Sequence, residues 1–262
     1  MEESNKDTTV ERRKKIMNLL SKNGQVYVQE LSKEFEVSEV TIRNDLDQLE
    51  KKNMLIRARG GALRLEHNVS IDHRLSDKDK LHFEEKSRIG KCAARLIKDY
   101  DTIIIDSGTT TMEIVKNLPE LKELNIITNA LNIVNQLVAQ NNSNVNIMML
   151  GGYLRRNSLS LVGPLADKNL MNLYVDKLFL AVDGFDIKQG VYTPNIEEAY
   201  LNQKMIDMSK EVILVTDSSK FNRKSMGFIC ETTRIHTVVT DSGLSEEDRK
   251  RLSELGIKVL IA

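Results

Sequence analysis

The sequence has few of the residues that build metal sites or disulfide frameworks. Its 262 residues include two cysteines and four histidines, and neither type is clustered. Cys92 and Cys230 lack the spacing of paired metal ligands, so we expect them to act as small apolar residues of a reduced protein. The scattered histidines are expected to be structural or solvated. The sequence therefore predicts neither a metal site nor a cofactor.

Long apolar runs and an excess of charge of one sign are also missing. No apolar stretch approaches membrane-spanning length, and the polar N-terminus has no signal-peptide pattern. We therefore expect a cytoplasmic protein that does not contact a membrane. The 38 basic and 38 acidic side chains balance, so the overall charge does not indicate a polyanionic partner. The length suits one large domain or two smaller ones.

Residues 1–65 have the pattern of a small helical domain. Apolar residues recur at helical spacing in three successive segments, namely Ile16, Leu19 and Leu20, then Leu31 and Phe35, then Ile42, Leu46 and Leu49. Ser38 can cap the third helix, within "EVSEVTIRNDLDQLEKK". Two helices followed by a turn and a third helix form the helix-turn-helix arrangement, whose last helix lies in the DNA major groove.

The outer face of the third helix and the segment after it suit contact with DNA. Arg43 and Asn44 can make paired hydrogen bonds to base edges. "MLIRARGGALRL" is expected to form a β-hairpin wing, whose arginines could meet phosphates or the minor groove. The predicted DNA-binding residues are Ser38, Glu39, Thr41, Arg43, Asn44, Arg57 and Arg59. The alternative is a three-helix packing module whose polar residues are simply solvated.

Nine motifs in one order resemble the DeoR family of bacterial transcriptional repressors. They are "ERRKKIMNLL", "VSEVTIRNDLDQLEKK", "RARGGAL", "DSGTTT", "TNALNI", "LGGYLRRNSLSLVGPLA", "AVDGFD", "YTPNIEEA" and "VTDSSKFNR". The resemblance implies a winged helix-turn-helix and a C-terminal sensor domain that resembles ribose-5-phosphate isomerase. It also implies a homo-oligomer that represses by binding double-stranded operator DNA and is released by a phosphorylated sugar.

Within the family, "TIRNDL" and "EEAYLNQKM" resemble the amino-sugar branch, represented by the repressor of the N-acetylgalactosamine pathway. This finer resemblance implies control of an operon for amino-sugar use. The expected effector is N-acetylgalactosamine 6-phosphate, galactosamine 6-phosphate or a tagatose phosphate.

Residues 66–80 are polar without an apolar period and are expected to be a linker. Residues 81–262 alternate between strand-like and helix-like runs, which predicts a Rossmann-like α/β domain with a largely parallel sheet. The expected strands are 102–105, 125–127, 146–150, 177–181, 211–215, 237–239 and 258–261. One expected helix begins near His82, and the others cover 112–117, 131–139, 167–173, 196–208 and 245–255.

Ligands of such sheets bind beyond the carboxyl ends of the strands. The polar or small residues that follow the expected strands, or lie in the later motifs, form the predicted effector site: Asp106, Ser107, Gly108, Thr109, Thr110, Thr128, Asn129, Gly151, Gly152, Asp183, Asn195, Glu198 and Lys220. Amides and hydroxyls at 107–110 can hold a phosphate at a helix N-terminus. The alternatives are ordinary ones, in which Asp106 caps a helix, the Gly151–Gly152 pair turns the chain and Lys220 is solvated.

Catalysis is the main alternative function, because the resembled isomerases act on sugar phosphates. Enediol chemistry needs a base beside the carbonyl. The isomerase pattern has a glutamate where "DGFDIKQG" places Ile187. Glu197 and Glu198 could substitute, but they lie on another segment. We therefore predict no catalytic residues and a sensor rather than an enzyme. A purely structural protein would explain neither the hydroxyl-rich edge nor the third helix.

Overall fold

The computed structural model describes residues 8–23, 25–51, 54–58, 60–64 and 72–262. The chain divides into two units, Met1–His67 and Asn68–Ala262. The predicted boundaries at residues 65 and 81 stay a prediction.

The N-terminal unit packs three helices and a small sheet around one apolar core. The helices are α1 (Thr9–Asn23), α2 (Val28–Glu34) and α3 (Glu39–Lys51), and the sheet contains β1 (Gln25–Tyr27), β2 (Leu55–Ala58) and β3 (Gly61–Arg64). Strand order is β1-β3-β2, with antiparallel pairs. Ile16, Leu31, Ile42 and Leu46 are buried in the core as their helical spacing predicts. The expected wing is confirmed as the β2–β3 hairpin, whereas β1 was not expected from the sequence.

A buried charge cluster joins the first and third helices. The Nε atoms of Arg12 and Arg13 on α1 lie 2.6 and 2.7 Å from the two carboxylate oxygens of Asp45 on α3. The Asp45 side chain is only 2% exposed. Because a buried carboxylate is costly without partners, these two contacts fix the inward face of α3 against α1.

The C-terminal unit is built on a seven-stranded sheet whose neighbouring strands all run parallel. Its strands are β4 (Thr102–Ile105), β5 (Leu124–Thr128), β6 (Val145–Met149), β9 (Val175–Leu180), β12 (Ser209–Val215), β14 (Thr237–Thr240) and β15 (Lys258–Ile261). Their order in the sheet is β15-β14-β12-β9-β4-β5-β6. All seven expected strands are therefore confirmed, and strand order reverses between β4 and β9.

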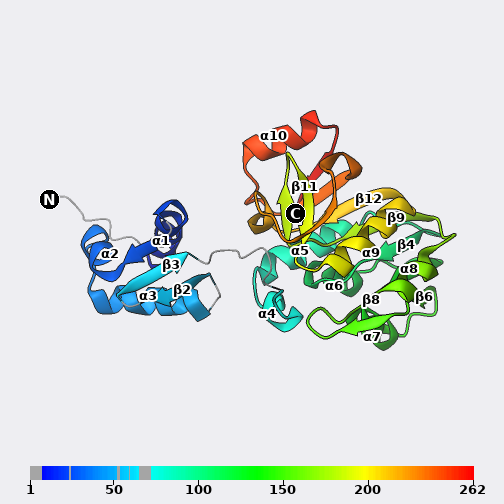
Figure 1. Ribbon diagram of the computed structural model, residues 1–262, viewed down its shortest axis with the longest axis horizontal. Coiled ribbons are helices and arrows are strands. Elements are labelled where there is room, and N and C mark those ends of the chain that lie inside the picture. Colours follow the sequence, from blue (N-terminus) through cyan, green and yellow to red (C-terminus); the bar gives the residue numbers. More distant parts are fainter. Residues whose placement is uncertain (1–7, 24, 52–53, 59, 65–71) are drawn as a thin grey trace. The chain divides into compact units, whose positions relative to one another are not determined.

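Helices cover both faces of this sheet (Figure 1). One face packs against α5 (Phe83–Ala94), α6 (Thr109–Lys116) and α7 (Leu131–Gln140), and the other against α8 (Pro164–Leu170), α9 (Ile196–Asp207) and α10 (Glu246–Glu254). Ile103 and Ile105 face the first layer, and Ile104 faces the second. Because alternate side chains enter different cores, each central strand is a continuous apolar run.

Several smaller elements were not expected from the sequence. A hairpin joins β7 (Tyr153–Arg155) to β8 (Ser160–Val162), and a second sheet contains β10 (Gly184–Asp186), β11 (Gly190–Thr193) and β13 (Gly227–Cys230). Within the interval expected to be a linker, residues Leu75–Asp79 form helix α4. Across the described part of the chain, no helix has the length and apolar character needed to span a membrane.

Replacing Asp45 with alanine should destabilise the N-terminal unit by about 3–5 kcal/mol, because two arginines would remain in a buried position without their carboxylate. Hydrogen exchange of α1 and α3 amides in the full-length protein measures this change. The matched control is Asp47→Ala on the exposed face of the same helix, where the lost ion pair should cost no more than about 1 kcal/mol. Equal exchange rates in the two variants would contradict the structural role of Asp45.

Candidate functional site

The outward face of α3 carries the predicted base-reading residues. Arg43 and Asn44 are exposed, while the flanking Ile42 and Asp45 are buried. The backbone N–H of Thr41 donates to the Ser38 hydroxyl over 3.1 Å, so Ser38 caps this helix as the sequence predicts. The arrangement leaves two side chains with paired hydrogen-bonding groups facing outward from a rigidly held helix.

Ion pairs occupy part of the predicted DNA-binding surface. Arg43 pairs with Glu39 one turn earlier on α3. Arg57 on β2 donates to Asp47 over 2.8 Å and also to the Gly61 carbonyl. Its guanidinium thus braces the wing against α3, a second role beside the predicted contact with DNA. Arg59 lies outside the described residues.

The second predicted site lies at the carboxyl edge of the parallel sheet. Strand order reverses between β4 and β9, and the chain leaves these neighbouring strands toward opposite sides. In open α/β sheets, the crevice at such a reversal is where ligands bind. Asp106 follows β4 at this position, and Asp183 follows β9 by a few residues.

The loop between β4 and α6 forms a bare helix N-terminus beside the end of β9. Gly108 precedes α6, and no side chain within the described structure caps this helix. The amides of Thr109, Thr110 and Thr111 at its first turn therefore have no partner within the helix. A Cβ atom at Gly108 would lie 2.7 Å from the Ala181 Cβ, so only glycine allows this approach. Thr109 and Thr110 are buried beside these donors.

Asp106 is a buried carboxyl group that is only partly satisfied. It is 2% exposed, and its Oδ2 accepts from the Asn202 Nδ2 over 3.0 Å. Oδ1 is buried and has no hydrogen bond of normal geometry among the described residues, although the backbone N–H groups of Ser107 and Ala181 act to lower the pKa of the carboxyl group. Burial, followed by the nearby Glu198 carboxylate, raises the pKa of Asp106 to about 8. At neutral pH the group is therefore mostly protonated and can donate a hydrogen bond.

Asn129 occupies the corresponding position on the neighbouring strand. Ile105 of β4 pairs with Thr128 of β5, which places Asp106 and Asn129 side by side just beyond the paired register. Asn129 is completely buried, yet neither its Oδ1 nor its Nδ2 has a partner in the described structure. Buried polar groups are nearly always hydrogen-bonded. Buried polar atoms without a partner in the described structure therefore lie on two adjacent strand ends.

Asp183 brings two lysines to the same edge. Its Oδ1 lies 2.8 Å from the Lys78 Nζ and 3.6 Å from the Lys220 Nζ. Burial alone would raise the pKa of Asp183, but the two ammonium groups outweigh it and lower that pKa to about 2. Asp183 and Lys220 thus meet as predicted, and Lys78 joins them unexpectedly.

Glu198 lies in a polar network on the same side. Its carboxylate accepts from the hydroxyls of Ser160 and Thr193, over 2.6 and 3.3 Å, and forms an ion pair with Arg155. The Asn195 Oδ1 accepts from the Glu198 backbone N–H over 3.0 Å, which caps α9. Asn195 therefore has a helix-capping role that accounts for its side-chain oxygen without a ligand.

Three other predicted residues have local structural roles. The Thr128 hydroxyl accepts from the Ala130 N–H over 3.1 Å. The Gly151 amide donates to the Asn169 Oδ1 over 2.9 Å. Gly152 has a φ of +131° and closely approaches the Val162 carbonyl, where a side chain would clash. No contact in the described structure links these two glycines to the Asp106 or Asp183 groups, so their place in the effector site stays a prediction.

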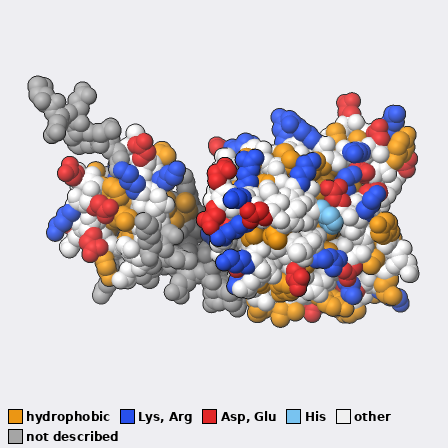
Figure 2. All heavy atoms as spheres, turned by 90° about the horizontal axis from the view of Figure 1, so that it is seen from above, with side chains coloured by type: hydrophobic (Ala, Val, Ile, Leu, Met, Phe, Trp, Pro, Cys, Tyr) orange, Lys and Arg blue, Asp and Glu red, His pale blue; other side chains and the backbone are white. Residues whose placement is uncertain are grey.

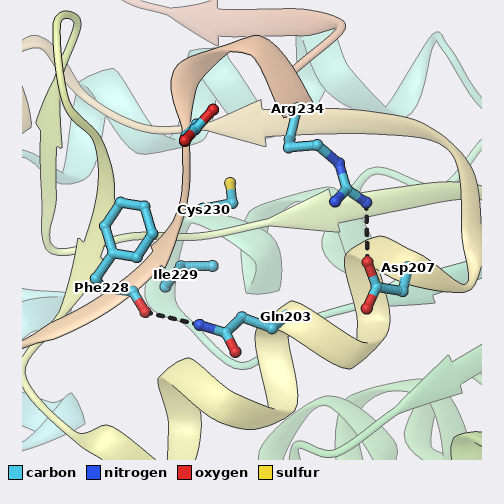
Figure 3. Close-up of a pocket in the computed structure, with 7 residues that line it drawn as sticks. Gln203, Asp207, Phe228, Ile229, Cys230 and Arg234 are labelled. Carbon is cyan, nitrogen blue, oxygen red and sulfur yellow. Dashed lines mark hydrogen bonds and ion pairs between the residues drawn. The ribbon is translucent and has the colours of Figure 1, made fainter.

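A pocket of about 330 Å³ lies elsewhere, between α9 and β13 (Figure 3). Gln203 donates to the Phe228 carbonyl over 3.1 Å, and Arg234 pairs with Asp207 at 3.0 Å. These two contacts pair Gln203 with the β13 backbone and Arg234 with α9. It contains none of the residues predicted to bind effector.

Charges of both signs occur together on one face of the molecule. On the face shown in Figure 2, Lys and Arg side chains are interspersed with Asp and Glu. The described residues contain no group of three His, Cys, Asp or Glu side chains arranged to hold a metal ion.

Sequence reasoning missed several residues at the sheet edge, which are Asp72, Lys78, Arg155, Ser160 and Asn202. Asn202 had a usable signal, because it follows Glu198 by one helical turn and so lies on the same face of α9. Asp72 and Lys78 had none, since they fall in a polar segment without an apolar period. Only the tertiary contacts of that segment bring them to the site.

Comparison with known proteins agrees with both units. Residues 12–68 match the DeoR-like helix-turn-helix domain, and residues 81–242 match the DeoR C terminal sensor domain. The chain is 40% identical to a protein of Escherichia coli O157:H7 named as an aga operon transcriptional repressor, over 97% of this chain and 94% of that protein. It is 33% identical to the lactose phosphotransferase system repressor of Staphylococcus epidermidis, over 90% and 93% of the two chains. Ribose 5 phosphate isomerase A of Neisseria gonorrhoeae is a distant structural neighbour, with 12% identity, a TM-score of 0.38 and coverage of 55% and 54%.

The fold and the matched domains define a transcriptional regulator that joins a helix-turn-helix DNA-binding domain to an α/β sensor domain. The chain belongs to the DeoR family of repressors. The relatives are regulators, which points to a protein that is not an enzyme.

Asp106 predicts a specific pH dependence of stability. The unfolded group ionises near pH ~4, whereas the folded group has a pKa of about 8, so between these values the folded state holds the additional proton. Rising pH should therefore destabilise the wild type relative to Asp106→Asn by about 1.4 kcal/mol per pH unit. Urea unfolding of both proteins at several values between about pH 5 and pH 8 measures the difference. Parallel stability profiles would show that Asp106 is ionised throughout this range.

Proposed function

We propose that the protein represses a carbohydrate-utilisation operon by binding operator DNA through α3. The exposed pair Arg43 and Asn44 supports this reading, because both can make two hydrogen bonds to one base. We also propose that the protein binds the operator as a homo-oligomer, because helix-turn-helix proteins usually bind paired half-sites with matching symmetry. Under this proposal the protein works in the cytoplasm, with residues 1–65 as the DNA-binding domain and 81–262 as the sensor.

The proposed effector is a phosphorylated sugar bound at the reversal of strand order. The observation that carries this proposal is a set of buried polar atoms without partners on adjacent strand ends, namely the Asp106 Oδ1 and the Oδ1 and Nδ2 of Asn129. The uncapped start of α6 supports a phosphate at residues 107–110, because helix N-termini bind anions. Asp183 and Glu198 can accept from sugar hydroxyls, and Lys220 supplies a cation.

The amino-sugar branch is the proposed specificity. The relative named for the aga operon and the segments "TIRNDL" and "EEAYLNQKM" support it. The proposed effectors are N-acetylgalactosamine 6-phosphate, galactosamine 6-phosphate and tagatose 6-phosphate, with release of the operator as the outcome. The isomerase alternative is disfavoured because Ile187, where that pattern has its base, is buried in the apolar core.

Arg43→Ala should weaken specific operator binding by about 1–3 kcal/mol and reduce discrimination between bases. Gel shifts on the upstream DNA of the gene, with single base-pair changes, measure both effects. Arg251→Ala is a matched control, because the side chain of this arginine is partly exposed and also pairs with a glutamate one helical turn earlier. Operator affinity that is unchanged in both Arg43→Ala and Asn44→Ala would remove α3 from base reading.

Lys220→Ala should repress normally but lose most of its response to the effector. The coupling free energy between effector binding and DNA binding typically amounts to about 1–3 kcal/mol, so the loss of one charged contact can remove most of it. The measurement is operator release by the three phosphorylated sugars, with the unphosphorylated sugars as ligand controls. Lys224→Ala is the protein control, since this lysine pairs with Asp186 in the same part of the unit.

The results separate three parts of the proposal. If Lys220→Ala is released from the operator at the same ligand concentration as the wild type, Lys220 is not part of the effector site. Release by an unphosphorylated sugar as effectively as by its phosphate would contradict the phosphate site at 107–110. Failure of all three phosphorylated sugars on the wild type would overturn the amino-sugar assignment.

A further inference from the structure

Residues 72–80, which we call the connector, are the first described part of the C-terminal unit. The connector contains the five-residue helix α4 and is held by backbone contacts to the hairpin between β7 and β8. The Leu75 N–H donates to the Asn157 carbonyl over 2.7 Å, and the Asn157 side chain donates to the Asp72 carbonyl over 3.3 Å. These contacts place a polar, short-helix segment firmly against the sensor.

Two charged side chains of the connector reach the residues proposed to bind effector. Lys78 donates to Asp183 over 2.9 Å. Asp72 pairs with Arg155, and the same guanidinium pairs with Glu198. The carboxylates of Asp183 and Glu198 are thus linked to the connector, the first directly and the second through Arg155.

The connector also approaches the candidate phosphate loop. Helix α4 packs against α6, whose N-terminus is formed by residues 108–111. The Lys86 ammonium on α5 donates to the Lys78 carbonyl and is itself buried. Positive groups from two elements are therefore gathered beside a helix end that favours anions.

Two lysines share one carboxylate in this part of the site. Lys78 and Lys220 lie 2.8 and 3.6 Å from the Oδ1 of Asp183. The carboxylates of Glu198 and Asp72 also attract Lys78, and both of them pair with Arg155. A phosphate entering beside Asp183 would find a cation already in place, and Asp183 would keep its other lysine.

We propose that the connector is a wall of the effector site, and that a sugar phosphate takes Lys78 from Asp183 when it binds. This inference rests on the proposed effector site and adds one effector-binding residue, Lys78. The movement of Lys78 would also transmit effector binding from the site to the connector. Since the connector precedes the sensor and follows the DNA-binding unit in the chain, a change in its anchoring changes the restraint on that unit.

The physical requirement is a difference between two states of the same contacts. A ligand shifts an equilibrium only through its different affinity for the two states. In the ligand-free state, the Lys78 ammonium holds the connector to Asp183. In the ligand-bound state, the same ammonium holds the connector to the phosphate instead. Removing the Lys78 ammonium removes this difference, even where the remaining contacts still hold the sugar.

The test uses the full-length wild type, Lys78→Met, Lys78→Arg and the control Lys80→Met, which alters an exposed lysine of the same segment. The probes are N-acetylgalactosamine 6-phosphate, galactosamine 6-phosphate and tagatose 6-phosphate. Binding is followed by thermal shift, operator affinity by gel shift, and the connector by hydrogen exchange of its amides. At a saturating concentration of the probe, the operator affinity of the wild type should fall by at least about 5-fold, because allosteric couplings usually change affinity by this much or more.

For Lys78→Met we expect less than a 2-fold change in operator affinity at a probe concentration that saturates its thermal shift. Lys78→Arg should recover most of the response, and Lys80→Met should behave as the wild type. Connector amides should change their exchange rates on binding in the wild type. Two outcomes would overturn this inference and leave the proposed function standing. In the first, a probe binds the wild type but leaves the exchange of the connector amides unchanged. In the second, a probe releases Lys78→Met from the operator as fully as it releases the wild type. If no probe binds the wild type, the proposed function fails and the inference falls with it.

Discussion

Parallel strands bury both faces of the C-terminal sheet, and this constraint determines where a ligand can bind. With Ile103, Ile104 and Ile105 committed to cores on alternate faces, β4 can present polar groups only beyond its carboxyl end. The reversal of strand order between β4 and β9 then separates the connecting chains at that end. Asp106 and Asp183 follow these two strands, at the position where ligands of open α/β sheets bind, and the Asp106 Oδ1 is buried there without a hydrogen-bond partner among the described residues.

Much of this could be predicted from the sequence because the responsible signals are local. Seven apolar runs defined the central strands, and helical spacing defined the core of the DNA-binding unit around Ile16 and Ile42. The edge residues were found by a rule that applies to any parallel sheet, so Asp106, Asn129 and Asp183 could be named without knowing the strand order. The contact between Asp183 and Lys220 is an example of two such residues meeting as expected.

The remaining features depend on tertiary contacts that no local pattern encodes. Helix α4 is five residues long, has no buried side chain and is held by contacts to the β7–β8 hairpin. Its segment therefore has the composition of a linker, and Lys78 could not be assigned to the site. Arg155 was missed for a similar reason, because its partners Asp72 and Glu198 are far away in the sequence. These omitted residues are the ones that connect the sensor to the chain leading from the DNA-binding unit.

The central claim is that a phosphorylated sugar binds at the carboxyl edge of the sheet, with its phosphate on the start of α6. The most direct test is a crystal structure of the full-length protein with a sugar phosphate that releases the operator. We expect the phosphate oxygens within hydrogen-bonding distance of the amides of residues 109–111, and a sugar hydroxyl or carbonyl on Asp106 or Asn129. A ligand seated instead in the pocket between α9 and β13, or at the sheet edge with its phosphate turned away from α6, would contradict the account.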